Sequence, residues 1–507
     1  MGLYKLWTYV SIASVALSAA ALLTLASLLA MDGQDRGQPS MVPRPGAVPK
    51  AQCGPGDRTE SGLQGQTTLA ERFSSASSRA YNCNLELVGQ FEGEGANWDL
   101  AVLGDCAYFG TANGPRQQHR GTVVVDAADP RHPKATAYLD SNAMLEPNES
   151  LDVHAGRKLL AGARSQGTDF DIYDLAANCR QPVLKANIKV PGITSHAGNF
   201  APDGRTYYGT FYRTGPASDT DVPPGMYAID VTDPSKPREI VRWTPSKDVG
   251  VPHHVYFSED GTRAYVGLIG HSPPAQPSPN GFAIVDVSDI QRRRPNPEFR
   301  LISRLVWEDG NLGQIPLPVT IKGRPYLIYT DAAGPGGAGA KASAAACAQG
   351  LPPHGFARVV DISDVKNPKV ISKLMLEVSD PANCSQVLND PVNFIGYSVS
   401  FCAADNPRNA QMLACTYYEA GLRVFDIRDP YHPREVAYYK PPARRKEIRP
   451  GSFLFTTTGG GDRTADAASF PGAFRKDKGE IWFVSQDNGL QIVRFTDRFR
   501  AAHKDLF

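Results

Sequence analysis

The chain repeats one pattern of apolar and polar residues seven times. Each copy begins with a small or aromatic residue, continues through a short β-branched run and, in six copies, ends on an aspartate that a proline-containing turn often follows. The aspartate copies are 121–126, 170–174, 225–230, 281–286, 356–361 and 421–426, and the seventh, 489–494, ends on Arg494. Short apolar runs bounded by turn signals predict β-strands.

A second strand signal precedes most of these segments. Runs that begin with glycine and end in an aromatic residue occur at 104–108, 204–208, 261–265, 323–326 and 479–482. The pairs Asp203-Gly204 and Asp260-Gly261 are typical of hairpins, because glycine accepts the positive φ that these turns require. Further apolar runs follow the proline turns, as at 239–243 and 370–374. Each repeat is therefore predicted to be a four-stranded antiparallel sheet.

The repeats are spaced like the blades of a β-propeller. Successive marker aspartates lie 48, 56, 56, 75 and 65 residues apart, close to blade periods once loops are added. The segment 84–91 has the character of an outer strand but precedes the first repeat, whereas the last repeat ends without one. Ring closure explains both ends, because the N-terminal strand then covers the edge of the last blade. We predict an all-β, seven-bladed propeller over residues 82–507; a sandwich or a solenoid would leave segment 84–91 unexplained.

The strand, aspartate and turn units resemble the LVIVD repeat of a family of exported bacterial β-propeller proteins. The resemblance covers roughly residues 82–497, and it implies the propeller fold. It implies no catalytic residue, because most proteins with this repeat are known only by the repeat. Arg494 and the long insertions in the fifth and sixth blades depart from the regular pattern.

The chain begins with a run long enough to cross a membrane. Leu6 to Met31 are 26 uncharged residues, and a transmembrane helix needs about 20. We predict an uncleaved signal anchor at 1–31 with Lys5 on the cytoplasmic side; a cleaved signal peptide is the alternative. Residues 32–81, rich in proline and glycine, are predicted to be a tether. Either alternative places the propeller on the periplasmic or extracellular side, anchored to the inner membrane or secreted.

Net charge excludes one class of partner. The chain has 53 lysines and arginines against 52 aspartates and glutamates, a net charge of +1, so no basic excess indicates nucleic acid. The expected partners are the membrane, through the N-terminal segment, and an unknown protein or small molecule.

Propeller topology places several histidines on one face. The loops that enter each innermost strand and the loops between the second and third strands open on the same side, here called the top face. Alignment of the two Asp-Gly turns puts His196 and His253 at equivalent positions, 57 residues apart, at the starts of innermost strands, and His254 is adjacent. His119, His271 and His354 lie in loops between second and third strands and are predicted on the same face.

Imidazoles that converge on a channel can bind Zn, Cu or Fe, so His196 and His253 are candidate metal ligands. The chain is similar to carotenoid oxygenases and methanethiol-oxidising selenium-binding proteins only in the general arrangement of histidines on inner strands. The alternative is that both residues bond neighbouring backbone at the channel rim. Acidic candidates near the mouth are Asp99, Glu149, Asp331 and Asp487, as a general acid or base or as a charged rim that keeps the channel wet.

Eight cysteines in an exported chain predict disulfides. Cys402 and Cys415 flank a turn and are expected to pair across a hairpin. Cys347 and Cys384 both lie in top-face connections around the fifth blade and are expected to pair there, across its insertion. Cys83 with Cys106 is a further expected pair, because the closing strand adjoins the first blade. Cys53 and Cys179 remain without an assigned partner.

Two classes of function remain open. The first expectation is a binding or scaffold module whose top face holds a protein or small ligand; its candidate residues are His196, His253, His254, Asp99, Glu149 and His354. The alternative is a metal-dependent oxidoreductase or hydrolase with a transition metal on His196 and His253. Stoichiometric metal in the purified protein would distinguish the two.

Overall fold

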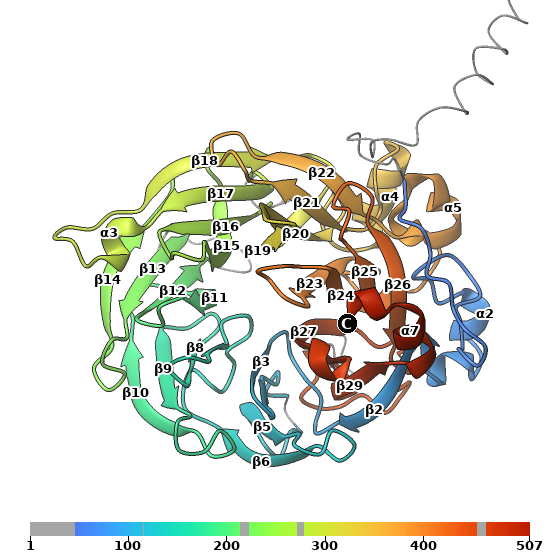
Figure 1. Ribbon diagram of the computed structural model, residues 1–507, viewed down its shortest axis with the longest axis horizontal. Helices are drawn as coiled ribbons and strands as arrows, with labels where there is room; N and C mark the ends of the chain where they lie inside the picture. Colours follow the sequence, from blue (N-terminus) through green and yellow to red (C-terminus); the bar gives the residue numbers. More distant parts are fainter. Residues whose placement is uncertain (1–45, 115, 213–222, 271–277, 454–462) are drawn as a thin grey trace, which may run out of the picture. The chain divides into compact units, whose positions relative to one another are not determined.

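Seven antiparallel sheets are arranged around a central axis (Figure 1). The computed structural model describes residues 46–114, 116–212, 223–270, 278–453 and 463–507. Six sheets have four strands each, and one has a fifth strand at its outer edge. The seven-bladed propeller predicted from the repeats is confirmed.

The blades follow one another along the chain, and each runs from an innermost to an outermost strand. Blades 1 to 3 are β3 (Leu100–Leu103), β4 (Cys106–Phe109), β5 (Thr122–Asp126) and β6 (Lys134–Leu139); β7 (Asp152–His154), β8 (Leu159–Ala163), β9 (Asp169–Asp174) and β10 (Val183–Lys189); and β11 (Ser195–Phe200), β12 (Thr206–Phe211), β13 (Gly225–Asp230) and β14 (Arg238–Trp243). Blades 4 and 5 are β15 (Val251–Phe257), β16 (Arg263–Ile269), β17 (Gly281–Asp286) and β18 (Arg300–Val306); and β19 (Asn311–Ile321), β20 (Arg324–Ala333), β21 (Ala357–Asp361) and β22 (Lys369–Leu374). Blade 6 is β23 (Val399–Ala404), β24 (Met412–Tyr417), β25 (Gly421–Asp426) and β26 (Arg434–Lys440), and blade 7 is β27 (Ala468–Arg475), β28 (Glu480–Ser485) and β29 (Gly489–Phe495).

The helical elements are short. They are α2 (Leu69–Arg72), α3 (Ser288–Gln291), α4 (Ala340–Ala348), α5 (Cys384–Val387), α7 (Asp497–Ala502), η1 (Ala76–Ser78), η2 (Glu377–Ser379), η3 (Pro381–Asn383), η4 (Tyr418–Ala420), η5 (Lys476–Lys478) and η6 (Lys504–Leu506). Within the described ranges, no helix combines the length and apolarity needed to cross a bilayer. The predicted anchor at 1–31 and the first part of the predicted tether, 32–45, lie outside the described residues.

The ring closes as predicted. Strand β2 (Leu85–Phe91) pairs antiparallel with β29, with Leu85 opposite Phe495 and Phe91 opposite Leu490, and so becomes the outer strand of blade 7. Just before it, β1 (Tyr81–Cys83) pairs with β26 and adds the fifth strand to blade 6. The N-terminal strands β1 and β2 are therefore the outermost strands of the last two blades.

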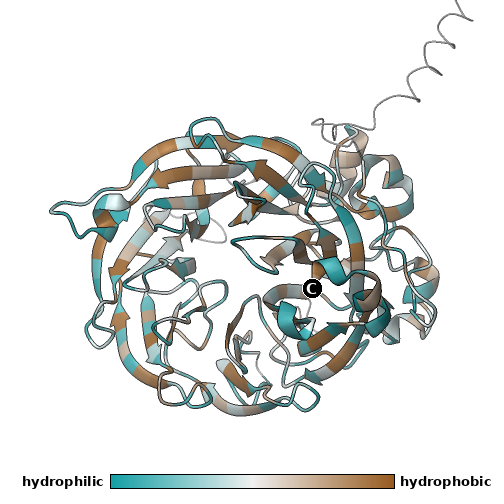
Figure 2. Ribbon diagram, viewed as in Figure 1, coloured by the Kyte–Doolittle hydropathy of each residue, from teal (hydrophilic) through white to brown (hydrophobic). Residues whose placement is uncertain are grey.

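The repeated aspartate has a local structural cause. At the end of the third strand in six blades, its carboxylate accepts the backbone N–H two residues later over 2.8 to 3.1 Å, at Asp126, Asp174, Asp230, Asp286, Asp361 and Asp426. This bond closes the turn to the outer strand. Gly204 and Gly261 have φ values of 62° and 69°, as the hairpin assignment requires. Figure 2 shows apolar residues along the strands, and β12 and β13 are buried throughout.

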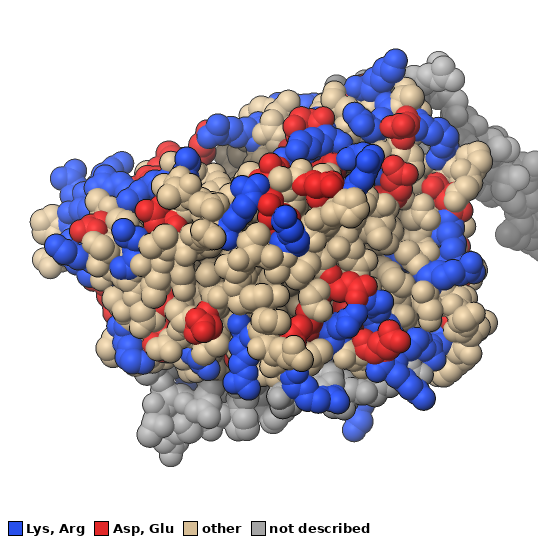
Figure 3. All heavy atoms as spheres, turned by 90° about the horizontal axis from the view of Figure 1, so that it is seen from below, with Lys and Arg blue, Asp and Glu red and all other residues tan. Residues whose placement is uncertain are grey.

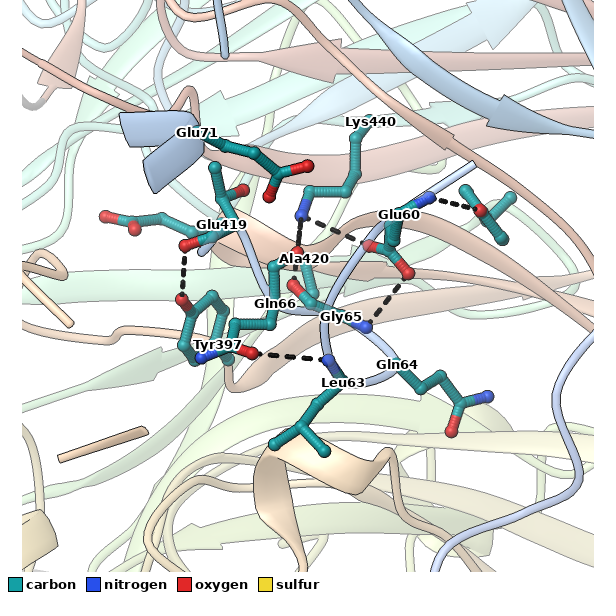
Figure 4. Close-up of polar contacts among 12 residues, drawn as sticks. Glu60, Leu63, Gln64, Gly65, Gln66, Glu71, Tyr397, Glu419, Ala420 and Lys440 are labelled. Atoms are coloured by element: carbon teal, nitrogen blue, oxygen red, sulfur yellow. Dashed lines mark hydrogen bonds and ion pairs between the residues drawn. The ribbon is translucent and has the colours of Figure 1, made fainter. Parts of the chain in front are cut away.

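The described part of the predicted tether packs against the propeller instead of leading away from it. The Val48 N–H bonds the Met375 carbonyl over 2.8 Å, and Arg72, with no exposed surface, donates to Glu419 over 2.7 Å. Figure 4 shows Lys440 reaching Glu60, a contact of 3.1 Å. For residues 46–80 the tether prediction is therefore wrong, because isolated buried polar contacts, which leave no periodic pattern, hold this segment in place.

All eight cysteines are paired. The pairs Cys402–Cys415 and Cys347–Cys384 are those predicted. The expected pair of Cys83 with Cys106 is wrong: Cys83 bonds Cys53, and Cys106 bonds Cys179. The reason is that Cys83 lies in β1, which joins blade 6, whereas Cys106 begins β4 in blade 1. Four disulfides are compatible with an oxidising periplasmic or extracellular location.

Candidate metal centre

A bulge near the start of the innermost strand positions the two predicted histidines. The register of β11 shifts between Ser195 and Gly198, and that of β15 shifts between Pro252 and Val255. His196 and His253 are the first residues of these bulges, a feature that re-aims side chains. In blade 2, Glu149 lies at the same height along the channel as His196. It forms a parallel β-bridge with Ala197, and its carbonyl accepts the Gly198 N–H over 3.3 Å.

Three buried donor atoms converge from blades 2, 3 and 4. The Nε2 atoms of His196 and His253 are 3.1 Å apart. The Oε2 atom of Glu149 lies 3.2 Å from His253 Nε2 and 3.6 Å from His196 Nε2. The relative exposures of Glu149, His196 and His253 are 4%, 7% and 1%. Oε2 of Glu149 and Nδ1 of His196 have no hydrogen-bond partner in the described part of the chain.

Burial sets the protonation of this cluster. Desolvation lowers the pKa of His196 to about 3, and the pKa of His253 is likewise about 3, chiefly through burial. Burial raises the pKa of Glu149, an effect that His253 partly opposes. Both imidazoles are therefore neutral at neutral pH, which is the form that binds a metal ion.

A tyrosine that sequence reasoning missed completes the surroundings. Tyr212 follows β12, and its hydroxyl lies 2.9 Å from His196 Nε2. Tyr418 occupies the corresponding position after β24, with its ring centroid 5.1 Å from that of Trp98. Burial and then Glu149 raise the pKa of both phenols well above the ordinary value. The register could have found Tyr212, because Ser195 pairs with Phe211, which puts residues 196 and 212 at the same end of blade 3.

The donor separations match a single metal ion. Two ligands with metal–ligand bonds of about 2.1 Å can lie no more than about 4.2 Å apart, and the separations of the three donor atoms are 3.1, 3.2 and 3.6 Å. Glu149, His196 and His253 would therefore be able to hold one ion together. Three protein ligands with a free position are typical of catalytic zinc sites, whereas structural sites are closed.

Two other predicted residues lie just below this cluster. His254 is buried, its Nδ1 accepts the Val255 N–H over 3.1 Å, and its ring stacks on Tyr256. Asp99 accepts the N–H groups of Leu100 and Leu151 over 2.8 and 3.0 Å. Burial and then Asp152 raise the pKa of Asp99 well above its ordinary value. Both residues line a channel cavity of about 460 Å³.

The remaining candidates lie elsewhere. His354 is buried edge-on against Tyr397, and His119 stacks on Tyr138; neither of these contacts involves the cluster. His271 lies outside the described residues. Asp331 and Asp487 are buried in ion pairs with Arg358 and Arg463. These pairs provide a structural role for both carboxylates.

His354 provides a test of burial by pH. Desolvation lowers the pKa of His354 from 6.5 to about 4. Between these two pH values the unfolded chain binds a proton at this imidazole, whereas the folded protein does not. Stability is therefore lost as the pH falls, by about 1.4 kcal/mol per unit. Compared with His354→Gln, the unfolding free energy of the wild type should fall by about 2 kcal/mol between pH 7 and 5. Chemical denaturation at both pH values measures this difference, and parallel pH profiles would contradict it.

The charged residues on the surface are mixed in sign, in agreement with the small net charge of the chain. On the face that Figure 3 shows, basic and acidic side chains are interspersed. This mixture agrees with the net charge of +1 and offers no basic surface for a nucleic acid on that face.

Comparisons with known proteins add the following. No protein-family model and no curated protein matches the chain. Among solved structures, it is similar to the periplasmic gluconolactonase PpgL of Pseudomonas aeruginosa, with 13% identity over 82% of this chain and 100% of that one and a TM-score of 0.44. It is also similar to the β-propeller domain of Myceliophteria thermophila Cps50 (Swd1), with 11% identity over 81% and 99% and a TM-score of 0.46. Hydrazine synthase of Kuenenia stuttgartiensis gives 14% identity over 64% and 82% and a TM-score of 0.39. The LVIVD resemblance stays a prediction.

Proposed function

We propose that the protein is a metal-dependent enzyme, an oxidoreductase or hydrolase, that holds one first-row transition metal ion on Glu149, His196 and His253. One observation carries the proposal: three buried donor atoms lie 3.1 to 3.6 Å apart, and one of them, Glu149 Oε2, has no hydrogen-bond partner among the described residues. Two histidines and one carboxylate are the ligands of zinc hydrolases and of non-haem iron oxygenases.

The residues around Glu149, His196 and His253 would support the chemistry that a bound metal ion supplies. A bound metal polarises a substrate oxygen or activates a water. The Tyr212 hydroxyl, 2.9 Å from His196 Nε2, is close enough to donate to an oxygen held there. Its raised pKa keeps this phenol protonated at neutral pH, which makes it a hydrogen-bond donor and not an anion.

We also propose that the enzyme works outside the cytoplasm, tethered by a signal anchor at 1–31, as a relative of the LVIVD-repeat propellers. The pairing of all eight cysteines supports an oxidising compartment, and the uncharged run 6–31 supports the anchor. Detection of the uncleaved N-terminus in the membrane fraction would test the anchor against the cleaved signal peptide.

Metal analysis tests the enzyme proposal. Protein purified without chelator, or reconstituted with Zn²⁺, Fe²⁺ or Co²⁺, should contain about one equivalent of metal. His196→Ala, His253→Ala and Glu149→Gln should each weaken metal binding by at least about 100-fold, the upper range for losing an outer-shell partner. His354→Gln is the control, because it also replaces a buried histidine but should retain the metal.

The binding module remains the second candidate. The cavity of about 460 Å³ beneath the cluster is within the size range of small-molecule sites. A wild type that stays free of metal after reconstitution, with an unchanged fold, would leave the cluster as hydrogen bonds among His196, His253 and Tyr212 with Glu149 beside them. That result would favour the binding module over the enzyme.

A further inference from the structure

Exposed apolar side chains gather on one side of the propeller. Nine large apolar residues are exposed in the described part of the chain, and four of them lie on α2, at its end, or in the loop after α5: Leu69, Phe73, Leu388 and Phe394. The most exposed is Phe73, with 73% of its surface in solvent. We call these four residues the apolar face. Single exposed apolar residues are normal, whereas a group of them indicates an interaction surface.

Hydrogen bonds hold the two parts of the apolar face together. The Gln66 side chain, just before α2, donates to the Gln386 carbonyl over 2.9 Å, and Arg72 donates to the Pro391 carbonyl over 3.4 Å. The Phe73 N–H bonds the Leu69 carbonyl over 3.0 Å, so the two side chains lie one helical turn apart on the same side of α2. The face is therefore one surface, built from segments about 320 residues apart in the sequence.

The segments around the apolar face carry almost no charge. The disulfide Cys347–Cys384 ties α4 to α5, and Figure 1 shows α2, α4 and α5 on the same side of the ring. Residues 332–356, which contain α4, have one charged residue, Lys341, and residues 381–396 have one, the buried Asp390. The whole chain is 21% charged. Toward solvent, α4 presents Ala340, Ala344, Ala345 and Ala348.

The described chain begins beside this surface. The Val48 N–H bonds the Met375 carbonyl over 2.8 Å, and a Cβ atom on Gly46 would lie 3.1 Å from Asp380 Oδ2. Asp380 caps η3, and α5 begins four residues later, which is at most about 14 Å of chain. Only residues 32–45 separate Gly46 from the uncharged run 6–31, and they can span no more than about 50 Å. The predicted anchor is thus attached on the side of the apolar face.

We propose that the apolar face and α4 lie against the outer surface of the bilayer that holds the anchor. This inference rests on the proposed signal anchor. Because an anchored chain keeps the face at a high local concentration near the lipid, a modest apolar area is enough to hold it there, as a second signal strengthens a first. Lys341 can extend its ammonium group to lipid phosphates while its stem covers apolar surface.

A fluorescent label on the apolar face tests the contact in the full-length protein. All eight native cysteines are paired, so Phe73→Cys and Leu388→Cys each provide a single free thiol for the fluorophore NBD. The protein is reconstituted into vesicles of phosphatidylcholine and phosphatidylglycerol, with and without lipids that carry a doxyl quencher in the acyl chain. These lipids should quench both labels by about half or more, because interfacial apolar groups insert about 5–10 Å deep.

Val183 provides the control position. It is 54% exposed on β10, in blade 2 and across the ring from α5 (Figure 1), so a label in Val183→Cys should lose no more than about a tenth of its emission. Adding Phe73→Ser to Leu388→Cys should lower quenching at position 388 by about twofold or more, since the largest apolar group of the face is lost. Adding Val183→Ser instead should leave that quenching unchanged.

The outcomes separate the contact from the anchor. Absent quenching at position 73 or 388, equal quenching at all three positions, or quenching that Phe73→Ser leaves unchanged would overturn the contact, with the anchor intact. A label at position 73 that resists aqueous iodide but not the doxyl lipids' absence of effect alone is decisive too: shielding without lipid quenching would assign the face to protein, either a second copy or residues 32–45, and would overturn the contact. Protein that alkaline carbonate extracts from the vesicles would refute the anchor, and the contact with it.

Discussion

Replacing Arg423 with alanine is expected to lower the free energy of unfolding by about 3–5 kcal/mol, the range for removing one partner of a buried ion pair. Arg423 has no exposed side-chain surface and donates to Glu435 over 3.0 Å and to Glu60. Burial alone would raise the pKa of Glu60, but Arg423 and Lys440 overcome it and hold that pKa below 4.5. Without the guanidinium, two buried carboxylates lose their main counter-charge.

Arg428 provides the control for this prediction. Arg428 lies two residues beyond β25, the strand that contains Arg423, and pairs with Asp426 and Asp505. However, 26% of its side chain is exposed. Arg428→Ala should therefore cost no more than about 1 kcal/mol. Guanidinium unfolding compares the two variants. Equal losses would contradict the argument, as would a failure of Glu60→Gln and Glu435→Gln to recover part of the Arg423→Ala loss.

The same contacts explain why the sequence was misleading for residues 46–80. Glu60 and Arg423 are 363 positions apart, and Arg72 and Glu419 are 347 apart. A segment held by single buried ion pairs shows no apolar period, so its proline and glycine content indicated a tether. The error extended to the disulfides, because Cys53, the partner of Cys83, lies in this segment.

Features that depend on local repetition could be predicted. The marker aspartates close the same turn in six blades, so their recurrence along the sequence indicated the repeat. Cys402 and Cys415 are direct cross-strand partners, and the hairpin between them could be predicted from the sequence. The strand at 84–91 was assigned correctly because it had no partner in the first blade.

The candidate site was predictable only in part, for a related reason. His196 and His253 lie at the same distance before the Asp-Gly turns that follow their strands, so aligning the two turns was enough to find both histidines. Blade 2 has no such turn, because Gly156 follows Ala155. Glu149 was therefore grouped with general acids instead of metal ligands.

Ring closure predicts a second large effect, at Leu85. This residue has no exposed surface and packs in one cluster with Val493 and Phe495 of blade 7. Leu85→Ala should lower the unfolding free energy by about 2–5 kcal/mol, the range for deleting a buried leucine side chain. Leu87, in the same strand but 41% exposed, is the matched control. Leu87→Ala should change the unfolding free energy by no more than about 0.5 kcal/mol.

The comparison separates a closed ring from an open array. In a closed ring, Leu85 belongs to the last blade, so its loss weakens the contact that joins the two ends of the chain, and unfolding should remain a single transition with a lower midpoint. If the N-terminal strand contributed nothing to closure, Leu85→Ala and Leu87→Ala would unfold alike. Equal midpoints would also remove the basis for placing Glu149, His196 and His253 on one axis, because their convergence depends on the blades that the closing strand holds in a circle.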